Sequence, residues 1–326
     1  MRAISLPPTP YDATAERPDW PGLPEGLRAA VAERLGGPVV ATTPAGAGFT
    51  RGFAAVLRTA TGGRAFVKAA DLRTQPHIAD WYAREAAITS RLPPGVPAAR
   101  PRWTLTAAGW YASCLDPIDG HVPPLPWREA ELAAALDAWA TAADALREPP
   151  DGLLALGLPR LADLLREDLS CWGEAAAGRA PMPPTPGPAA ARLRDLVALE
   201  AALPVYADAT AVIHCDLRLD NILIDPAGAA WICDWNWPCF GPAWFDTASL
   251  LVTAYASGLD ADRLFAGHPT ARGAPPDALD ASLAALSGFW LARGAGAPTD
   301  ASSHVRGHQT WSGRQALAWL AARRDW

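Results

Sequence analysis

Short apolar segments separated by turns fill the first third of the chain. Their alternation of apolar and polar residues is typical of half-buried β-strands. We expect strands over residues 39–43, 53–59, 64–69, 102–106 and 110–115. One helix over 27–35, ending at Gly36 and Gly37, and a second over 81–88 accompany them. This pattern predicts a five-stranded antiparallel sheet with a packed helix.

Beyond about residue 120, apolar residues recur at the spacing of amphipathic helices. We expect helices over residues 127–146, 158–172, 189–203, 244–256, 277–292 and 304–324. Two apolar runs, 211–213 and 222–224, enclose a polar loop, and another strand comes next at 230–233. The first 22 residues hold five prolines and are expected to form an irregular arm. The chain is therefore expected to be an α+β protein, with a small sheet lobe and a larger, mostly helical lobe.

The polar loop carries the residues from which a catalytic site is predicted. Asn221 lies five residues after Asp216, and Asp234 lies thirteen residues after Asn221. Phosphoryl transfer uses a carboxylate for the incoming hydroxyl, then an amide and a second carboxylate that hold Mg²⁺ at the nucleotide phosphates. The alternative is a hairpin whose Asp and Asn residues only serve turns, which accounts for Asp220 and Asp225 but not for this spacing.

The stretch His214-Cys-Asp-Leu-Arg-Leu-Asp-Asn221 resembles the catalytic loop of the aminoglycoside phosphotransferase family, whose fold is like that of protein kinases. The segment Asp234-Trp-Asn-Trp-Pro-Cys-Phe-Gly-Pro-Ala-Trp-Phe-Asp246 resembles the metal-binding segment that comes after this loop in that family. The resemblance covers roughly residues 36–260. It implies a protein-kinase-like two-lobe fold.

The resemblance also implies roles for single residues near the predicted catalytic Asp216. His214 is expected to stabilise the loop by hydrogen bonding, with a role as general base as the alternative. Arg218 lies two residues beyond Asp216, so it is expected to pair with that carboxylate or with the transferring phosphate. Asp246 is expected to anchor the loop, and as the first residue of a helix it also suits an ordinary cap.

Residues ahead of the loop fit a nucleotide-binding lobe. Lys68, the only lysine of the chain, ends an apolar strand and is expected to direct its ammonium at nucleotide phosphates. Glu85, seventeen residues later, is expected to pair with it as in kinases, with a solvated helix face as the alternative. Gly46 and Gly48 lie where a kinase has its phosphate-covering loop, in which glycines let N–H groups approach an anion. A glycine-rich hairpin without a ligand is the other interpretation.

The segment 116–120 matches the hinge that joins the two lobes of a kinase. Backbone groups between Leu115 and Ile118 are expected to bind the purine base. Pro117 removes one N–H donor there, which leaves the choice between ATP and GTP open. The expected organisation is an arm and helix (1–35), an N-lobe (36–115), the hinge (116–120) and a C-lobe (121–326).

Composition narrows the classes of protein that remain. The net charge of −6 does not suit a nucleic-acid binder, and no stretch approaches the ~18 apolar residues of a membrane-spanning helix. The beginning of the chain lacks the apolar segment of a secretory signal. Five cysteines at irregular spacing argue for a reducing cytoplasm. A zinc site of His214 with Cys215, Cys233 and Cys239 is an alternative, which the lack of a Cys-x-x-Cys motif disfavours.

The expected activity is transfer of the γ-phosphoryl group of ATP or GTP, with Mg²⁺, to a hydroxyl of a small molecule by a monomer or dimer. The resemblance makes an antibiotic the leading acceptor, but kinases of choline, homoserine, fructosamine and methylthioribose share the architecture. A nucleotide-binding pseudokinase is the alternative from another class. A protein kinase is disfavoured because Asp246 comes within twelve residues of Asp234, which leaves little room for a peptide platform.

The helix predicted over 158–172 and the C-terminal helices are expected to form the acceptor cleft together. A basic acceptor would need several carboxylates of the first helix, Asp163, Glu167 and Asp168, to face the cleft. Core packing is expected to account for most of the fifteen tryptophans, and stacking of Trp235 or Trp237 on a ring of the acceptor is the alternative for these two.

Overall fold

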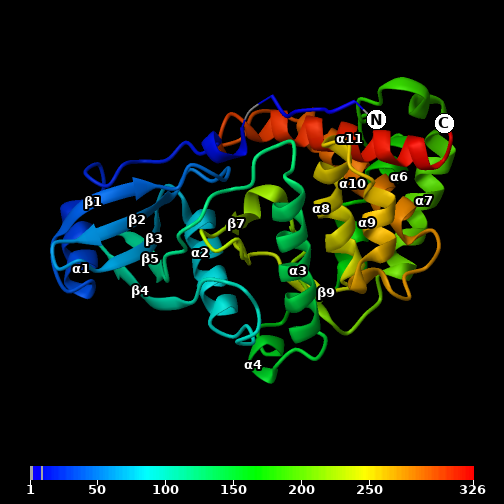
Figure 1. Cartoon of the computed structure of the whole chain (residues 1–326). Helices are drawn as coiled ribbons and strands as arrows, with labels where there is room; N and C mark the ends of the chain where they lie inside the picture. Colours follow the sequence, from blue (N-terminus) through cyan, green and yellow to red (C-terminus); the bar gives the residue numbers. More distant parts are fainter. Residues whose placement is uncertain (1–2, 9) are drawn as a thin grey trace.

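The computed structural model describes residues 3–8 and 10–326. A sheet lobe and a larger helical lobe lie side by side (Figure 1). The strands of the sheet lobe form one antiparallel sheet in the order β1-β2-β3-β5-β4. They are β1 (Val39–Pro44), β2 (Phe53–Thr59), β3 (Arg64–Asp71), β4 (Pro101–Ala107) and β5 (Trp110–Leu115). The predicted α+β class and the five-stranded antiparallel sheet are confirmed.

The alternation of side chains along β3 sets the direction of the predicted phosphate-binding lysine. Ala65, Val67 and Ala69 are buried in one apolar cluster with residues of helix α1 (Glu25–Arg34). Successive side chains of a strand point to opposite faces, so Lys68 lies on the other face of the sheet. Helix α2 (Pro76–Thr89) packs there, between the sheet and the helical lobe (Figure 1).

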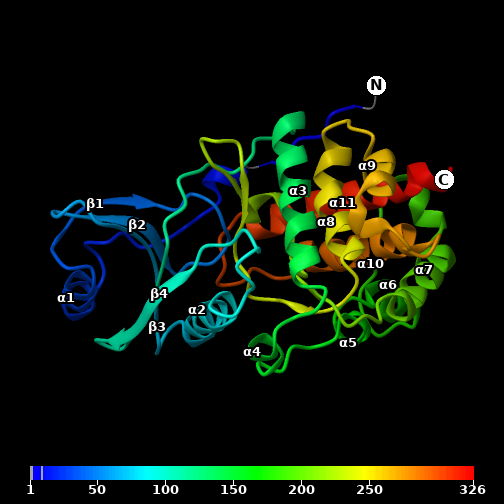
Figure 2. The same ribbon diagram turned by 60° about the horizontal axis from the view of Figure 1, so that its bottom comes forward.

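The helical lobe packs its helices around two that are buried along most of their length. These are α8 (Trp244–Ala256) and α10 (Ala278–Gly294), and a helix that is apolar on all sides belongs in a core. The other α-helices of the lobe are α3 (Glu129–Ala145), α4 (Asp151–Leu154), α5 (Leu161–Glu167), α6 (Cys171–Ala176), α7 (Leu193–Tyr206), α9 (Ala261–Gly267) and α11 (Val305–Arg323). Figure 2 shows α11 behind α3 and α8. Among the described residues, no helix has the length and apolar character needed to cross a membrane.

The polar loop lies between two small sheets of the helical lobe. Strand β6 (Val212–Ile213) pairs with β9 (Cys239–Phe240), and β7 (Ile222–Ile224) pairs with β8 (Ala230–Ile232). A short 3₁₀ turn, Leu219–Asn221, leads from the loop into β7. The two pairings bring the beginning of the loop and the segment after β8 together, as the predicted site requires.

The prediction of one continuous helix over 158–172 is wrong, because two short helices, α5 and α6, take its place. The carboxylate of Glu200 in α7 accepts hydrogen bonds from the backbone N–H groups of Trp172 (3.0 Å) and Gly173 (2.7 Å). The indole of Trp172 donates to the carbonyl of Ala284 in α10 (2.8 Å). These contacts with distant residues satisfy the free N–H groups of a new helix N-terminus, so the helix restarts at Cys171.

The N-terminal arm contacts both lobes. Trp20 is buried in the apolar cluster of the sheet lobe. Ser5 donates its backbone N–H to Ala256 at the end of α8 (2.8 Å), and Tyr11 shares a hydrogen bond with His308 of α11 (2.7 Å). In Figure 1 the arm runs from α11 across to the sheet. The arm is irregular, as predicted, but it joins the two lobes.

Close packing between α10 and α11 gives a first prediction. A Cβ atom at Gly313 would lie 2.8 Å from Cγ and 2.9 Å from the backbone nitrogen of Leu291, so Gly313→Ala should lower the free energy of unfolding by about 1–3 kcal/mol. At Gly307 of the same helix, the nearest atom to an added Cβ would be Cγ of Pro8 at 3.4 Å. Gly307→Ala should therefore leave stability unchanged or raise it by at most about 1 kcal/mol. Urea unfolding measures both, and equal effects would contradict the packing argument.

A second prediction concerns pH. Burial, assisted by the charge of Arg218, lowers the pKa of His308 to about 3, although Asp220 acts in the opposite direction. Below the ordinary pKa of about 6.5 the unfolded chain therefore binds a proton that the folded protein does not, so stability falls as pH decreases. Between pH 7 and pH 5 this proton should cost about 2 kcal/mol.

Urea unfolding of the wild type and of His308→Gln at both pH values tests this expectation. The variant should lose about 2 kcal/mol less than the wild type over that range. Equal losses in the two proteins would show that His308 takes up its proton in the folded state.

Candidate active site

A buried carboxylate holds the start of the catalytic loop. Oδ2 of Asp246, in the first turn of α8, accepts hydrogen bonds from the backbone N–H groups of His214 (2.7 Å) and Cys215 (3.1 Å). Cys215 has a φ of 65°, which is unusual for a residue other than glycine. Burial raises the pKa of Asp246 to about 7. Asp246 therefore fixes the strained backbone immediately before Asp216, as expected of an anchor.

His214 is fully buried beneath the loop. Its Nε2 lies 2.9 Å from the carbonyl oxygen of Cys233, and its Nδ1 lies 3.3 Å from the backbone nitrogen of Asp216. Burial lowers its pKa to about 4, so the ring is neutral at pH 7, donating at Nε2 and accepting at Nδ1. Both ring nitrogens contact the backbone, which favours a stabilising role over that of a general base.

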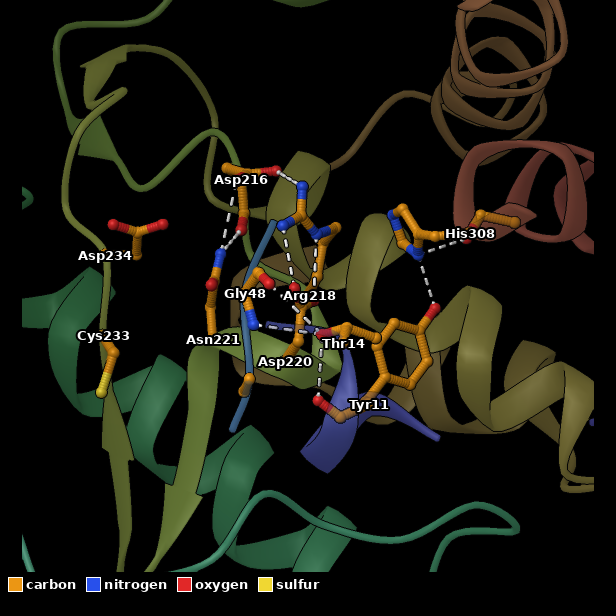
Figure 3. Close-up of polar contacts among 12 residues, drawn as sticks. Tyr11, Thr14, Gly48, Asp216, Arg218, Asp220, Asn221, Cys233, Asp234 and His308 are labelled. Atoms are coloured by element: carbon orange, nitrogen blue, oxygen red, sulfur yellow. Dashed lines mark hydrogen bonds and ion pairs between the residues drawn. The ribbon is translucent and has the colours of Figure 1, made fainter. Parts of the chain in front are cut away.

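The side chain of Asp216 contacts both Arg218 and Asn221 (Figure 3). Its Oδ1 accepts a hydrogen bond from Nη1 of Arg218 (2.7 Å), and Asn221 Nδ2 lies 3.3 Å from its Oδ2. The rest of the Arg218 fork donates to both oxygens of Asp220, each at 3.0 Å. Burial raises the pKa of Asp216 to about 7, against the opposing charge of Arg218. Arg218 therefore contacts the Asp216 carboxylate, one of the two partners predicted for it.

Asn221 and Asp234 both lie on the side of Arg218 away from His308 (Figure 3). Asn221 uses its amide nitrogen to bond the Asp216 carbonyl (2.8 Å), which leaves Oδ1 without a hydrogen bond to any described residue. The Asp234 side chain is 38% exposed, and although burial raises its pKa, Lys68 and Arg218 bring that pKa below its ordinary value. An amide oxygen and an ionised carboxylate are ligands that suit Mg²⁺, which keeps several waters and binds phosphates as well.

The described residues contain no cluster of three or more His, Cys, Asp or Glu side chains with metal-binding geometry. A magnesium ion held by two protein oxygens, phosphates and water does not need one. Sequence reasoning missed Asn236, which donates to Oδ1 of Asp234 (2.6 Å) and is buried. Its position two residues after the metal-type carboxylate is the only signal that could have indicated it.

Lys68 and Glu85 form a buried ion pair, with 2.6 Å between Nζ and Oε2. Nζ also lies 3.3 Å from Oδ1 of Asp234 and 5.3 Å from the ring centre of Tyr82. Burial lowers the pKa of Lys68, but Glu85 and Asp234 together raise it above its ordinary value. The side chain of Glu85 is only 4% exposed, which excludes the solvated helix face. The structure thus brings Lys68 and Glu85 to the segment that carries Asp234.

The glycine-rich turn lies across the catalytic loop. The ring centre of Phe49 is 5.8 Å from the Arg218 guanidinium and 4.9 Å from the His308 ring centre. Gly48 has a φ of 100°, a conformation that favours glycine. Gly46 and Gly48 therefore lie in a loop whose residue Phe49 is close to Arg218. Arg218 in turn contacts Asp216.

The segment after β5 passes from one lobe to the other beside β7. Leu115 is buried and Ile118 half-buried. The backbone N–H of Asp116 donates to the backbone carbonyl of Arg100 (2.8 Å). His121 and Ile224 exchange two backbone hydrogen bonds, at 3.0 and 2.9 Å. These contacts hold the predicted hinge against the strand that begins after Asn221.

The three carboxylates that a basic acceptor is expected to contact lie on the surface of the protein. Asp163, Glu167 and Asp168 are all exposed, and two of them pair with arginines, Asp163 with Arg166 (2.9 Å) and Asp168 with Arg293 (3.8 Å).

The two candidate tryptophans differ in exposure. Trp235 is 1% exposed, so it cannot stack on a substrate, whereas Trp237 is 48% exposed. The rings of Trp237 and Trp81 meet edge to face, with centres 5.8 Å apart. Of the two, only Trp237 is available to an acceptor.

Comparisons with known proteins identify the family of this chain. The model of the phosphotransferase enzyme family matches residues 43–282. A comparison with curated proteins gave no match. A thermostable mutant of aminoglycoside phosphotransferase APH(4)-Ia is 14% identical, with a TM-score of 0.61 over 91% of this chain and 99% of that one.

Two other solved structures are similar to this chain. Macrolide 2'-phosphotransferase MphH from Brachybacterium faecium is 17% identical, with a TM-score of 0.53 over 80% of this chain and 89% of that one. Plasmodium vivax ethanolamine kinase is 12% identical, with a TM-score of 0.53 over 86% and 81%. At these identities the likeness shows the fold, and the predicted kinase-like fold is confirmed. Because the family model spans most of its length, the chain belongs to the phosphotransferase enzyme family and is a nucleotide-dependent phosphotransferase.

Proposed function

We propose that this phosphotransferase moves the γ-phosphoryl group of ATP or GTP, bound with Mg²⁺, to a hydroxyl of a small molecule. The observation that carries the proposal is the convergence of Asp216, Asn221 and Asp234 with the Lys68–Glu85 ion pair. These groups come from segments far apart in sequence and have the chemistry of donor binding and hydroxyl activation.

Each of these side chains has one role in the proposed reaction. Asn221 Oδ1 and the Asp234 carboxylate would hold Mg²⁺, which supplies positive charge to the phosphate oxygens. Lys68, oriented by Glu85, would contact the donor phosphates. Asp216 would orient the acceptor hydroxyl and accept its proton, and Arg218 keeps that carboxylate in position at 2.7 Å. His214 stays neutral and stabilises the loop.

For the acceptor, we propose an antibiotic hydroxyl, with neutral acceptors preferred over polycationic ones. Structures similar to this chain include an aminoglycoside and a macrolide phosphotransferase. A polycationic acceptor would need free carboxylates, but Asp163 and Asp168 already pair with arginines. Trp237 offers an exposed ring for apolar contact with a sugar or macrocycle. The five free thiols support a reducing, cytoplasmic location.

A mass-spectrometric assay tests the reaction. The purified protein is incubated with ATP or GTP, Mg²⁺ and a panel of macrolides, aminoglycosides, nucleosides, choline and homoserine. We expect a gain of one phosphate on a neutral antibiotic. Asp216→Asn should lower the rate roughly 10²–10⁴-fold, and the same change at the exposed Asp208 should not. If no compound gains phosphate although the protein binds nucleotide, a pseudokinase becomes the better interpretation.

Calorimetric titration separates the two carboxylates. Asp234→Asn should weaken nucleotide binding in the presence of Mg²⁺ roughly 10–100-fold, because an ionised metal ligand is lost. Asp216→Asn should leave that affinity nearly intact, since its side chain is assigned to the acceptor. Should Asp216→Asn abolish nucleotide binding while Asp234→Asn keeps normal turnover, the two roles are exchanged.

A further inference from the structure

The N-terminal arm lies against the glycine-rich loop, here called the phosphate loop and defined as residues 46–52. Ala15 donates its backbone N–H to the Gly46 carbonyl (2.8 Å). The hydroxyl of Thr14 lies 3.2 Å from the nitrogen and 3.4 Å from the carbonyl oxygen of Gly48. Figure 3 shows Thr14 between Gly48 and Tyr11. None of the expected nucleotide-binding residues lies in this arm.

Arg17 makes the most contacts between the arm and the loop. Its Nη2 donates to the carbonyl of Ala47 (3.0 Å), and its Nη1 donates to the carbonyl of Gly52 (2.9 Å). Nη1 also lies 3.1 Å from the hydroxyl of Thr50. One planar guanidinium therefore bonds both ends of the phosphate loop, which a flexible ammonium cannot do with the same geometry.

These contacts involve the carbonyl groups of the loop much more than its N–H groups. Its carbonyls accept hydrogen bonds at six positions, namely Gly46, Ala47, Gly48, Phe49, Arg51 and Gly52. By contrast, Gly48 is the only residue of the loop whose N–H donates to another described residue. The other N–H groups of the loop donate to no described residue, and successive free N–H groups are the feature that forms concave phosphate-binding sites.

The glycines of the loop make room for the arm. A Cβ atom at Gly46 would overlap the carbonyl oxygen of Asp12, and one at Gly48 would lie 2.8 Å from Nη2 of Arg17. Ser302 of the helical lobe contacts both the loop and the arm. Its backbone N–H donates to the carbonyl of Phe49 (2.7 Å), and its hydroxyl donates to the carbonyl of Thr14 (2.6 Å). The arm therefore packs directly against the phosphate loop.

We propose that Arg17 is a positioning residue that holds the carbonyls of the phosphate loop outward, so that the loop's N–H groups face the phosphates of the donor. The inference rests on the proposed function, because it assigns the donor to this loop. It extends the nucleotide site to a residue that contacts neither the base nor the metal.

Binding measurements on three variants test the inference. Arg17→Ala should weaken the binding of magnesium ATP or GTP roughly 10–100-fold, the effect of hydrogen bonds to charged groups. It should leave the binding of adenosine or guanosine, which lack phosphates, unchanged. Arg17→Lys should recover only part of the loss, since it keeps the charge without the fork. Arg28→Ala is the matched control, because Arg28 also donates to a backbone carbonyl, that of Leu23, but outside the phosphate loop.

Each outcome decides the question. Equal weakening of triphosphate and nucleoside binding would mean a general structural role and would overturn the inference. So would wild-type affinity in Arg17→Ala, or full recovery in Arg17→Lys. If Arg17→Ala does not fold, Arg17→Gln replaces it with the same expected result. If the wild type itself binds neither ATP nor GTP with Mg²⁺, the proposed function fails instead.

Discussion

The ion pair between Lys68 and Glu85, extended to Asp234, is the interaction on which the arrangement of the two lobes depends. It connects β3 and α2 of the sheet lobe with the segment after β8 of the helical lobe. Glu85 is buried, so removing its partner would leave an uncompensated charge, at a cost of about 3–5 kcal/mol. Charge balance therefore connects the two lobes at the very place where donor phosphates are expected.

The catalytic loop obeys a different constraint, that of a strained backbone held by buried polar groups. Both Cys215 and Asp234 have positive φ, at 65° and 62°. Such conformations cost roughly 1–3 kcal/mol each and persist only where their surroundings determine them. Asp246 holds Cys215 in place by accepting a hydrogen bond from its backbone N–H. His214 connects the loop to Cys233, the residue before Asp234. The two strained positions are thus joined through one buried histidine.

Sequence patterns identified the features that depend on local order. The strands could be predicted from alternation, and Asp216, Asn221 and Asp234 from their spacing around short apolar runs. Features decided by distant residues could not be found in this way. The break between α5 and α6 depends on Glu200 of α7. The burial of Trp235 and the exposure of Trp237, two residues apart in a loop without periodicity, depend on tertiary packing.

The contacts of the arm also have a consequence for the order of synthesis. Chains fold largely from the N-terminus as the ribosome makes them. Ser5, Tyr11 and Thr14 precede the sheet in the sequence, yet their partners Ala256, His308 and Ser302 belong to the last quarter of the chain. All five strands of the sheet are therefore made before these three contacts between the arm and the helical lobe can form. The contacts that tie the arm to the helical lobe can therefore form only after His308 of α11 has been made.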